Sequence, residues 1–163
     1  MQVYLDNAAT TPMDVQVIEK MTEVMHDVYG NASAIHAMGR KARAEVELAR
    51  KSIAKLLNCE GSEIVFTGSG TEADNMALRC ATNDLNVKHI ITSKIEHKAV
   101  LGTAKELDAK GIASIHYVDL DIYGRAELAS LTQLAQKYPG SLISLMHANN
   151  EIGTLNDISA ISK

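Results

Sequence analysis

From residue 63 onward, short apolar runs rich in β-branched residues alternate with longer stretches of helical periodicity. Each run has the length and composition of a buried strand. Amphipathic stretches follow the first three runs, and a last short helix follows the fourth. This order predicts a βαβαβαβ arrangement, in which a parallel sheet is joined by right-handed crossovers. The runs are EIVFT (63–67), HIITS (89–93), SIHYVDL (114–120) and LISLMHA (142–148).

The first 60 residues have a different pattern, because helical periodicity dominates there. A short segment, YLDNAAT, precedes a predicted helix from about residue 14 to 29, and a second helix is predicted from about residue 38 to 57. Pro12 is placed to open the first helix, since a proline at the first helical position loses no hydrogen bond. A turn at Gly30-Asn31 separates the two helices.

Polar clusters follow three of the predicted strands. They are GSGTEAD (68–74), IEHKAV (95–100) and NNEI (149–152). In open parallel sheets, ligands bind beyond the carboxyl ends of the strands. The three clusters therefore predict one shared ligand site.

The GSGT turn (68–71) lies between a predicted strand and a predicted helix. Free backbone N–H groups and the helix dipole at such a turn favour an anion, most simply a phosphate. An ordinary capped turn is the alternative, with Thr71 as N-cap and Asp74 completing an approximate capping box. The local sequence leaves both interpretations open.

Two known phosphate motifs can be compared with this turn. The Walker A motif does not fit, because no Lys-Ser/Thr pair follows the glycines. The dinucleotide fingerprint G-x-G-x-x-A is satisfied by Gly68, Gly70 and Ala73, and Glu96 lies near the spacing expected for a ribose-binding acid. A Rossmann-type oxidoreductase domain is therefore an alternative.

His97 and the Asn149-Asn150 pair are the remaining candidates for chemistry. An imidazole at a strand end can stack on a flat ligand or move a proton near neutral pH. Buried asparagines are costly unless their amides are satisfied, which favours a role in binding a ligand or fixing a loop. The other histidines share no metal-ligand spacing and are interpreted as non-catalytic: His26, His89, His116 and His147.

Composition excludes several classes of function. The apolar content of 46% and the charged content of 22% are typical of a globular protein. A net charge of −4 without a basic stripe argues against direct nucleic-acid binding. No apolar run approaches the roughly 20 residues needed to span a bilayer, so no membrane association and a cytoplasmic location are expected. Cys59 and Cys80 belong to no metal or redox motif.

Five segments together strongly resemble the N-terminal part of cysteine desulfurases of the NifS/IscS type, which are pyridoxal phosphate enzymes of the class V aminotransferase group. The segments occur in the family's order: YLDNAATTP, GNASAIH, EIVFTGSGTEADN, HIITSKIEHKAVL and HANNEIGT. The resemblance implies a three-layer αβα fold with a mainly parallel sheet, incomplete in this chain. Residues 1–60 would pack on the large domain, and residues 61–163 would form its first part.

The resemblance also implies roles for individual residues. Gly70 and Thr71 match the residues that hold the cofactor phosphate, and His97 matches the catalytic histidine that stacks on the pyridine ring. Asn150 matches the asparagine near the ring hydroxyl and the substrate carboxylate. The family converts L-cysteine to L-alanine and passes the sulfur, as an enzyme persulfide, to acceptor proteins of iron–sulfur cluster assembly or tRNA thiolation.

Three family motifs have no match in this chain: the lysine that binds the cofactor covalently, the aspartate facing the ring nitrogen, and the cysteine that receives sulfur. Lys94 and Lys98 flank His97 but do not match the lysine position. Because these motifs are missing, the isolated chain is expected to be inactive without a complementary C-terminal part. The resemblance also implies a homodimer for the intact enzyme. A folded but inactive binding module is the alternative.

Overall fold

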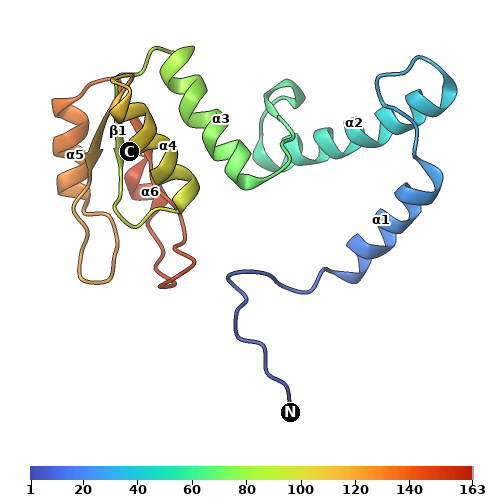
Figure 1. The fold of residues 1–163 in the computed structure, drawn as a ribbon, viewed down its shortest axis with the longest axis horizontal. Coiled ribbons are helices and arrows are strands. Elements are labelled where there is room, and N and C mark those ends of the chain that lie inside the picture. The colour runs from blue at the N-terminus through green and yellow to red at the C-terminus, as the bar shows by residue number, and fades with distance from the viewer. Residues whose placement is uncertain (163) are drawn as a thin grey trace. The chain divides into compact units, whose positions relative to one another are not determined.

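The computed structural model describes residues 1–162, which form two compact units, residues 1–66 and residues 67 onward (Figure 1). The first unit contains two helices and a single 3₁₀ turn. These are α1 (Val15–Asp27), α2 (Ala37–Leu57) and η1 (Gly61–Glu63). Each unit is described by itself below. The assignment of residues 1–60 as a segment that packs on the large domain stays a prediction.

Both long helices of the first unit lie within two residues of their predicted bounds. The carboxylate of Asp14 caps α1 by accepting the Gln16 N–H over 2.8 Å. The prediction that Pro12 opens this helix is wrong, because the capping carboxylate two residues later sets the start. Lys20 of α1 pairs with Glu45 of α2 at 3.3 Å. This contact joins the two helices.

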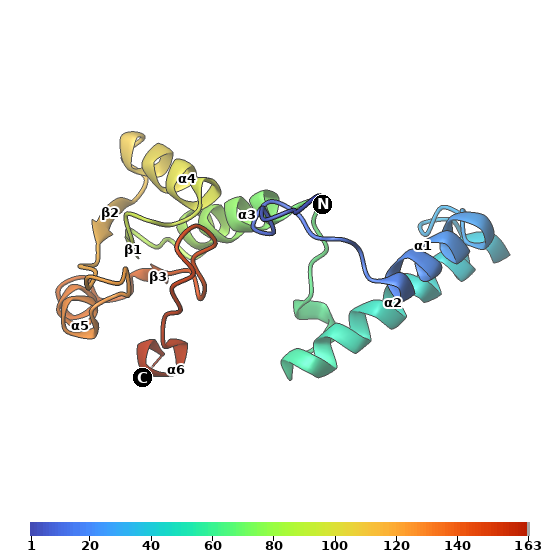
Figure 2. The same cartoon turned by 90° about the horizontal axis from the view of Figure 1, so that it is seen from below.

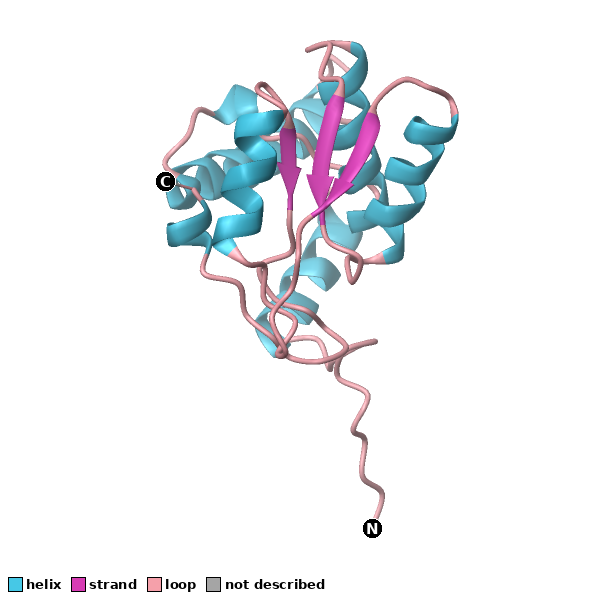
Figure 3. Ribbon diagram, turned by 90° about the vertical axis from the view of Figure 1, so that its left-hand side faces the viewer, coloured by secondary structure: helices cyan, strands magenta, loops and turns pink. Residues whose placement is uncertain are grey.

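The second unit is built on a parallel sheet of three strands in the order β2-β1-β3. The strands are β1 (His89–Thr92), β2 (Ser114–Tyr117) and β3 (Leu142–Ser144). All three run in the same direction, with helices on both sides of the sheet (Figure 3). Polar residues that follow the strands therefore gather at one edge, as the sequence predicts.

Four helices cover the two faces of this sheet. They are α3 (Gly70–Asn83), α4 (Lys98–Ala109), α5 (Leu128–Lys137) and α6 (Ile158–Ile161). Ile90 and Ile91 are fully buried and point to opposite faces, because side chains alternate along a strand. Ile90 packs with Leu78 of α3 and residues of α4, whereas Ile91 packs with Leu131 of α5. Helices α4 and α5 thus lie on opposite sides of the strands (Figure 2). The predicted α/β fold with three layers is confirmed.

The predicted strand at residues 63–67 does not form. Glu63 ends η1, and residues 64–67 make no ladder in the part of the chain that the structure describes. A strand requires a neighbour to satisfy its N–H and C=O groups, and the three strands present pair only with one another. The apolar composition of this segment was therefore not sufficient for a strand. Of the helices within residues 1–162, none combines the length and hydrophobicity needed to cross a membrane.

Candidate functional site

A pocket of about 320 Å³ opens beyond the carboxyl ends of β1 and β3. Its lining comes from the segment that follows β1 and from the loop that follows β3: Ile95, Glu96, His97, Lys98, Asn150 and Glu151. Two of the four predicted site residues, His97 and Asn150, thus line one pocket although 53 positions separate them along the chain. Gly70 and Thr71 are not among the lining residues.

His97 is the N-cap of α4. Its Nδ1 accepts the N–H of Ala99 over 3.1 Å, while the residue itself stays exposed. A neutral imidazole with an accepting Nδ1 carries its proton on Nε2. The helix cap therefore selects the tautomer of His97, in which Nε2–H is a hydrogen-bond donor.

The two adjacent asparagines have different roles. Asn149 is buried, and its Oδ1 accepts the N–H groups of Glu151 (2.9 Å) and Ile152 (3.1 Å). Its Nδ2 donates to the carbonyl of Ile95 over 2.9 Å. Asn150 is exposed and lines the pocket. Asn149 fixes the loop, whereas Asn150 lies at the pocket.

Glu96 has a buried carboxylate, with 7% of the residue exposed. The Ser93 hydroxyl donates to Oε1 over 3.0 Å, and the Met146 N–H donates to the same carboxylate over 3.0 Å. Burial raises the pKa of Glu96 and the nearby Asp74 adds to this, whereas the bonds from Met146 and Ser93 act in the opposite direction. Because the carboxylate is used inside the fold, the predicted ribose-binding role of Glu96 is wrong.

The start of α3 differs in detail from the predicted capped turn. Ser69 is the N-cap, and its Oγ accepts the Glu72 N–H over 3.2 Å. The carboxylate of Glu72 accepts the Gly68 N–H over 2.7 Å. The prediction of a Thr71 cap with Asp74 is wrong, because the helix begins at Gly70, two residues earlier than that arrangement requires.

The first amides of α3 are suited to an anion. The N–H groups of Gly70 and Thr71 lie in the first turn, where no intrahelical acceptor exists. A Cβ placed on Gly70 would meet no heavy atom within 4 Å, so the space beside this backbone is open. Helix geometry thus leaves two donors that an approaching phosphate oxygen can reach.

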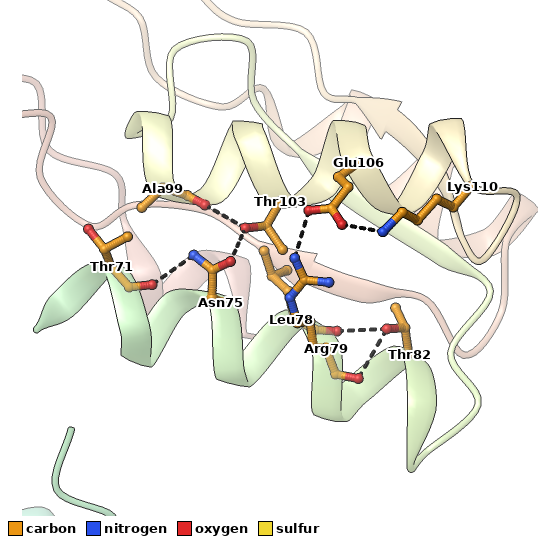
Figure 4. A network of polar contacts seen from close by, with 9 residues as sticks. All are labelled: Thr71, Asn75, Leu78, Arg79, Thr82, Ala99, Thr103, Glu106 and Lys110. Carbon is orange, nitrogen blue, oxygen red and sulfur yellow. Dashed lines mark hydrogen bonds and ion pairs between the residues drawn. The ribbon is translucent and has the colours of Figure 1, made fainter. Parts of the chain in front are cut away.

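A polar network joins α3 to α4 and was not anticipated from the sequence (Figure 4). The Asn75 amide donates to the Thr71 carbonyl over 2.8 Å, and its Oδ1 accepts the Thr103 hydroxyl over 2.6 Å. Farther along the same two helices, Arg79 pairs with Glu106 at 2.7 Å. Lys110 and Arg79 lower the pKa of Glu106 to about 2. In the sequence, the network is indicated only by polar residues that lie on the same helix faces as apolar residues.

His89 and His116 lie away from this pocket. His89 begins β1, at the opposite end from the pocket, and its Nδ1 lies 3.1 Å from Nε2 of His116. His116 stacks on Tyr138 with ring centroids 3.7 Å apart. Within residues 1–162, no group of three or more metal-ligating side chains is arranged to hold a metal ion.

A family model described as aminotransferase class-V matches residues 3–163. The chain belongs to this family. Among proteins of similar sequence, the cysteine desulfurase IscS of Dictyoglomus turgidum is 44% identical over 164 residues, which cover 99% of this chain and 41% of the relative. The corresponding protein of Neisseria meningitidis is 46% identical over 164 residues, with 99% and 40% covered. The chain therefore spans about two fifths of the length of these relatives.

Solved structures of similar fold cover nearly the whole of this chain. A NifS-like protein superposes with a TM-score of 0.90 at 40% identity, covering 99% of this chain and 44% of that one. A structure of SspA in complex with cysteine superposes with a TM-score of 0.86 at 35% identity, covering 97% and 46%. The resemblance to class V enzymes is confirmed, and the Rossmann-type alternative is wrong.

Proposed function

We propose that this chain is the N-terminal portion of a pyridoxal phosphate-dependent cysteine desulfurase. Such an enzyme converts L-cysteine to L-alanine and passes sulfur to an acceptor as a persulfide. The observation that carries the proposal is that His97 and Asn150, which follow different strands, line one pocket. The similarity of nearly the whole chain to proteins named cysteine desulfurase supports the same activity.

The residues present fit pyridoxal phosphate. The open backbone at Gly70 and the free amides of Gly70 and Thr71 suit its phosphate. The exposed imidazole of His97 suits its ring, and the Asn150 amide suits the polar groups at the ring's edge. When bound, the cofactor supplies an electron sink for chemistry at the amino acid's α-carbon.

His97 is set up to pack and to donate a hydrogen bond. In the tautomer selected by the Ala99 N–H, the free nitrogen Nε2 carries a proton and has no lone pair to accept another. Accepting a proton at Nε2 first requires the proton to move to Nδ1, which breaks the cap bond. Losing an N-cap interaction costs about 1 kcal/mol. The structure therefore favours orientation of the ring over proton transfer as the role of His97.

The charge around the phosphate site is mixed. Glu72 places a carboxylate at the Gly68 N–H, so it occupies one donor of the turn and repels an anion at the next two. Replacing Glu72 by glutamine keeps an acceptor for Gly68 and removes the charge. We therefore expect Glu72→Gln to bind phosphate more tightly, by roughly twofold to fivefold on the scale of helix-terminus effects.

Further features of the intact enzyme are part of the proposal. The family pattern suggests a homodimer, a cytoplasmic location, and sulfur acceptors in iron–sulfur cluster assembly or tRNA thiolation. The cofactor's lysine and the sulfur-receiving cysteine would be contributed by sequence beyond the matched two fifths. A complementary chain would supply them to this one.

The proposal is tested by titrating the chain with pyridoxal 5'-phosphate and following cofactor absorbance. We expect binding that inorganic phosphate competes away, that is lost in His97→Ala, and that is strengthened by Glu72→Gln. Glu127→Gln is the control, because Glu127 is exposed and precedes α5 instead of α3. Binding that is insensitive to phosphate and to His97→Ala would contradict the proposed site.

Borohydride reduction followed by peptide mapping separates the two functional outcomes. A cofactor fixed to a specific lysine of this chain, with turnover of L-cysteine, would mean that the chain is an enzyme by itself. Reversible, phosphate-dependent binding without turnover is the outcome expected of the chain alone. Adding a polypeptide that covers the remaining length of a relative should then restore cysteine turnover.

A further inference from the structure

We propose that Asn75 and Thr103 are positioning residues that set the register of α3 against α4, so that the phosphate and ring contacts match one cofactor. This inference rests on the proposed function. Asn75 lies one turn after Thr71 in α3. Thr103 lies one turn after Ala99 in α4, and the Ala99 N–H donates to the N-cap residue His97. The Asn75–Thr103 bond thus connects the second turns of α3 and α4, one turn after the residues that carry the predicted ligand contacts.

The donors and acceptors of Asn75 and Thr103 allow only one arrangement of the hydrogen bond between them. Thr103 has one hydroxyl proton and two acceptors nearby, Asn75 Oδ1 at 2.6 Å and the Ala99 carbonyl at 3.0 Å. The shorter contact takes the proton, since the Ala99 carbonyl already lies in the helix ladder. Asn75 then uses its oxygen toward α4 and its NH₂ group toward Thr71. The amide orientation follows from these partners (Figure 4).

Burial distinguishes this bridge from the other polar contact between the helices. Thr103 is 5% exposed, so sliding one helix along the other would break its bond to Asn75 and leave the Asn75 oxygen without this partner, while the hydroxyl would retain only the Ala99 carbonyl of its own helix. The Arg79–Glu106 pair is about 40% exposed on both sides and is solvated whether or not it forms. Apolar contacts alone tolerate small shifts, whereas the Asn75–Thr103 bond specifies one register.

Pyridoxal phosphate has two groups, the phosphate and the ring, which must be contacted at the same time, so its affinity depends on the register of the two helices. Gly70 and Thr71 begin α3, and His97 precedes α4, so a change of register displaces the phosphate contacts relative to the ring contact. A ligand that touches only one of them is unaffected. A ligand that must reach both loses the advantage of simultaneous contact, which depends on the geometry of the two sites.

The test uses Thr103→Val, which keeps the shape of the side chain and removes the hydroxyl, and Thr103→Ser, which keeps the hydroxyl. Arg79→Ala is the control on the same interface. We expect Thr103→Val to weaken pyridoxal 5'-phosphate binding by about tenfold, the scale of one hydrogen bond. Affinity for inorganic phosphate should stay unchanged, Thr103→Ser should restore cofactor affinity, and Arg79→Ala should have little effect.

If the wild-type chain binds no cofactor, that result contradicts the proposed function but not the positioning role. A second measurement then tests the positioning role by itself. In amide NMR spectra, Thr103→Val should shift the resonances of Thr71 and Glu72 on α3, although the substitution is on α4. Shifts confined to the neighbours of residue 103 would overturn the positioning role. So would an equal loss of affinity for phosphate and for the cofactor, because that pattern indicates general destabilisation.

Discussion

The side-chain amide of Asn149 donates to the main-chain carbonyl of Ile95 over 2.9 Å. The two residues follow β3 and β1, which are neighbours in the sheet. Next to this bond, Glu96 accepts the Met146 N–H in the same direction across the two strand ends. The loops that present His97 and Asn150 are thus held together by the buried side chains of Asn149 and Glu96.

Asn149→Ala should destabilise the protein much more than Asn150→Ala. The first variant leaves the carbonyl of Ile95 and the N–H groups of Glu151 and Ile152 without their partner, and a lost buried hydrogen bond costs about 1–3 kcal/mol. The second removes an exposed amide and should change the free energy of unfolding by less than about 0.5 kcal/mol. Urea unfolding measures both. Equal effects would mean that Asn149 does not anchor the loop.

Gly124→Ala should weaken ligand binding at the pocket, whereas Gly140→Ala should not. Both glycines have positive φ, +80° and +75°, so both variants should lose about 1–2 kcal/mol of stability. At Gly124 the added Cβ would lie 2.7 Å from Cδ1 of Ile152 and 3.2 Å from Cδ1 of Ile95, which lines the pocket. At Gly140 it meets nothing within 4 Å. Binding of pyridoxal 5'-phosphate by the two variants tests the difference.

Glu96→Gln should remove a component of the pH dependence of stability. Because the folded-state pKa of Glu96 is raised above 4.5, the folded state binds more protons than the unfolded state between these two values. Stability from this group is complete below pH 4.5 and falls as the pH rises through the folded-state pKa. Glu96→Gln should therefore gain stability relative to the wild type from pH 4 to pH 7. Parallel urea-unfolding curves across this range would contradict the assignment.

His116 should contribute the opposite dependence. Burial, His89 and Lys137 lower its pKa below 6.5, and Asp108 acts weakly against them. The unfolded state then binds more protons, so stability falls as the pH drops from about 6.5 toward the folded-state pKa. His116→Phe retains an aromatic ring to stack on Tyr138 and removes the titration. Its unfolding free energy should be flatter than that of the wild type between pH 7 and pH 5.

Thr92→Val should stabilise the protein. Thr92 is fully buried in β1, and its Oγ1 has no hydrogen-bond partner among the described residues. Valine has the same shape and avoids the cost of a buried, unpaired hydroxyl, which is about 1 kcal/mol. Thr82→Val is the matched control, because the buried Thr82 hydroxyl contacts the carbonyls of Leu78 and Arg79. That variant should be less stable than the wild type in thermal unfolding.

Local patterns predicted the helices well and the strands less completely. Helix periodicity depends on neighbours three and four residues apart, so α1 and α2 were placed to within one or two residues. A strand depends on partners elsewhere in the chain, and residues 63–67 have none in this structure. The resemblance to class V enzymes supplied the fold that periodicity alone left open.

The candidate site shows a similar division. His97 and Asn150 could be predicted because polar residues after parallel strands share one edge. The tautomer of His97, the inward use of Glu96 and the Asn75–Thr103 bridge depend on side-chain orientation between distant segments. The cap of α3 was misplaced because Ser69 and Thr71 both carry a hydroxyl suited to that position.

The central strand of the sheet, β1, precedes both of its neighbours in the chain. Pairing with β2 closes a loop about half as long as pairing with β3, and each doubling of loop length costs about 0.6 kcal/mol of closure entropy. We therefore expect β1, α4 and β2 to associate early in folding and β3 to dock late. The loop that carries Asn150 would then arrive last, so the pocket would be completed only in the final step on the folding pathway.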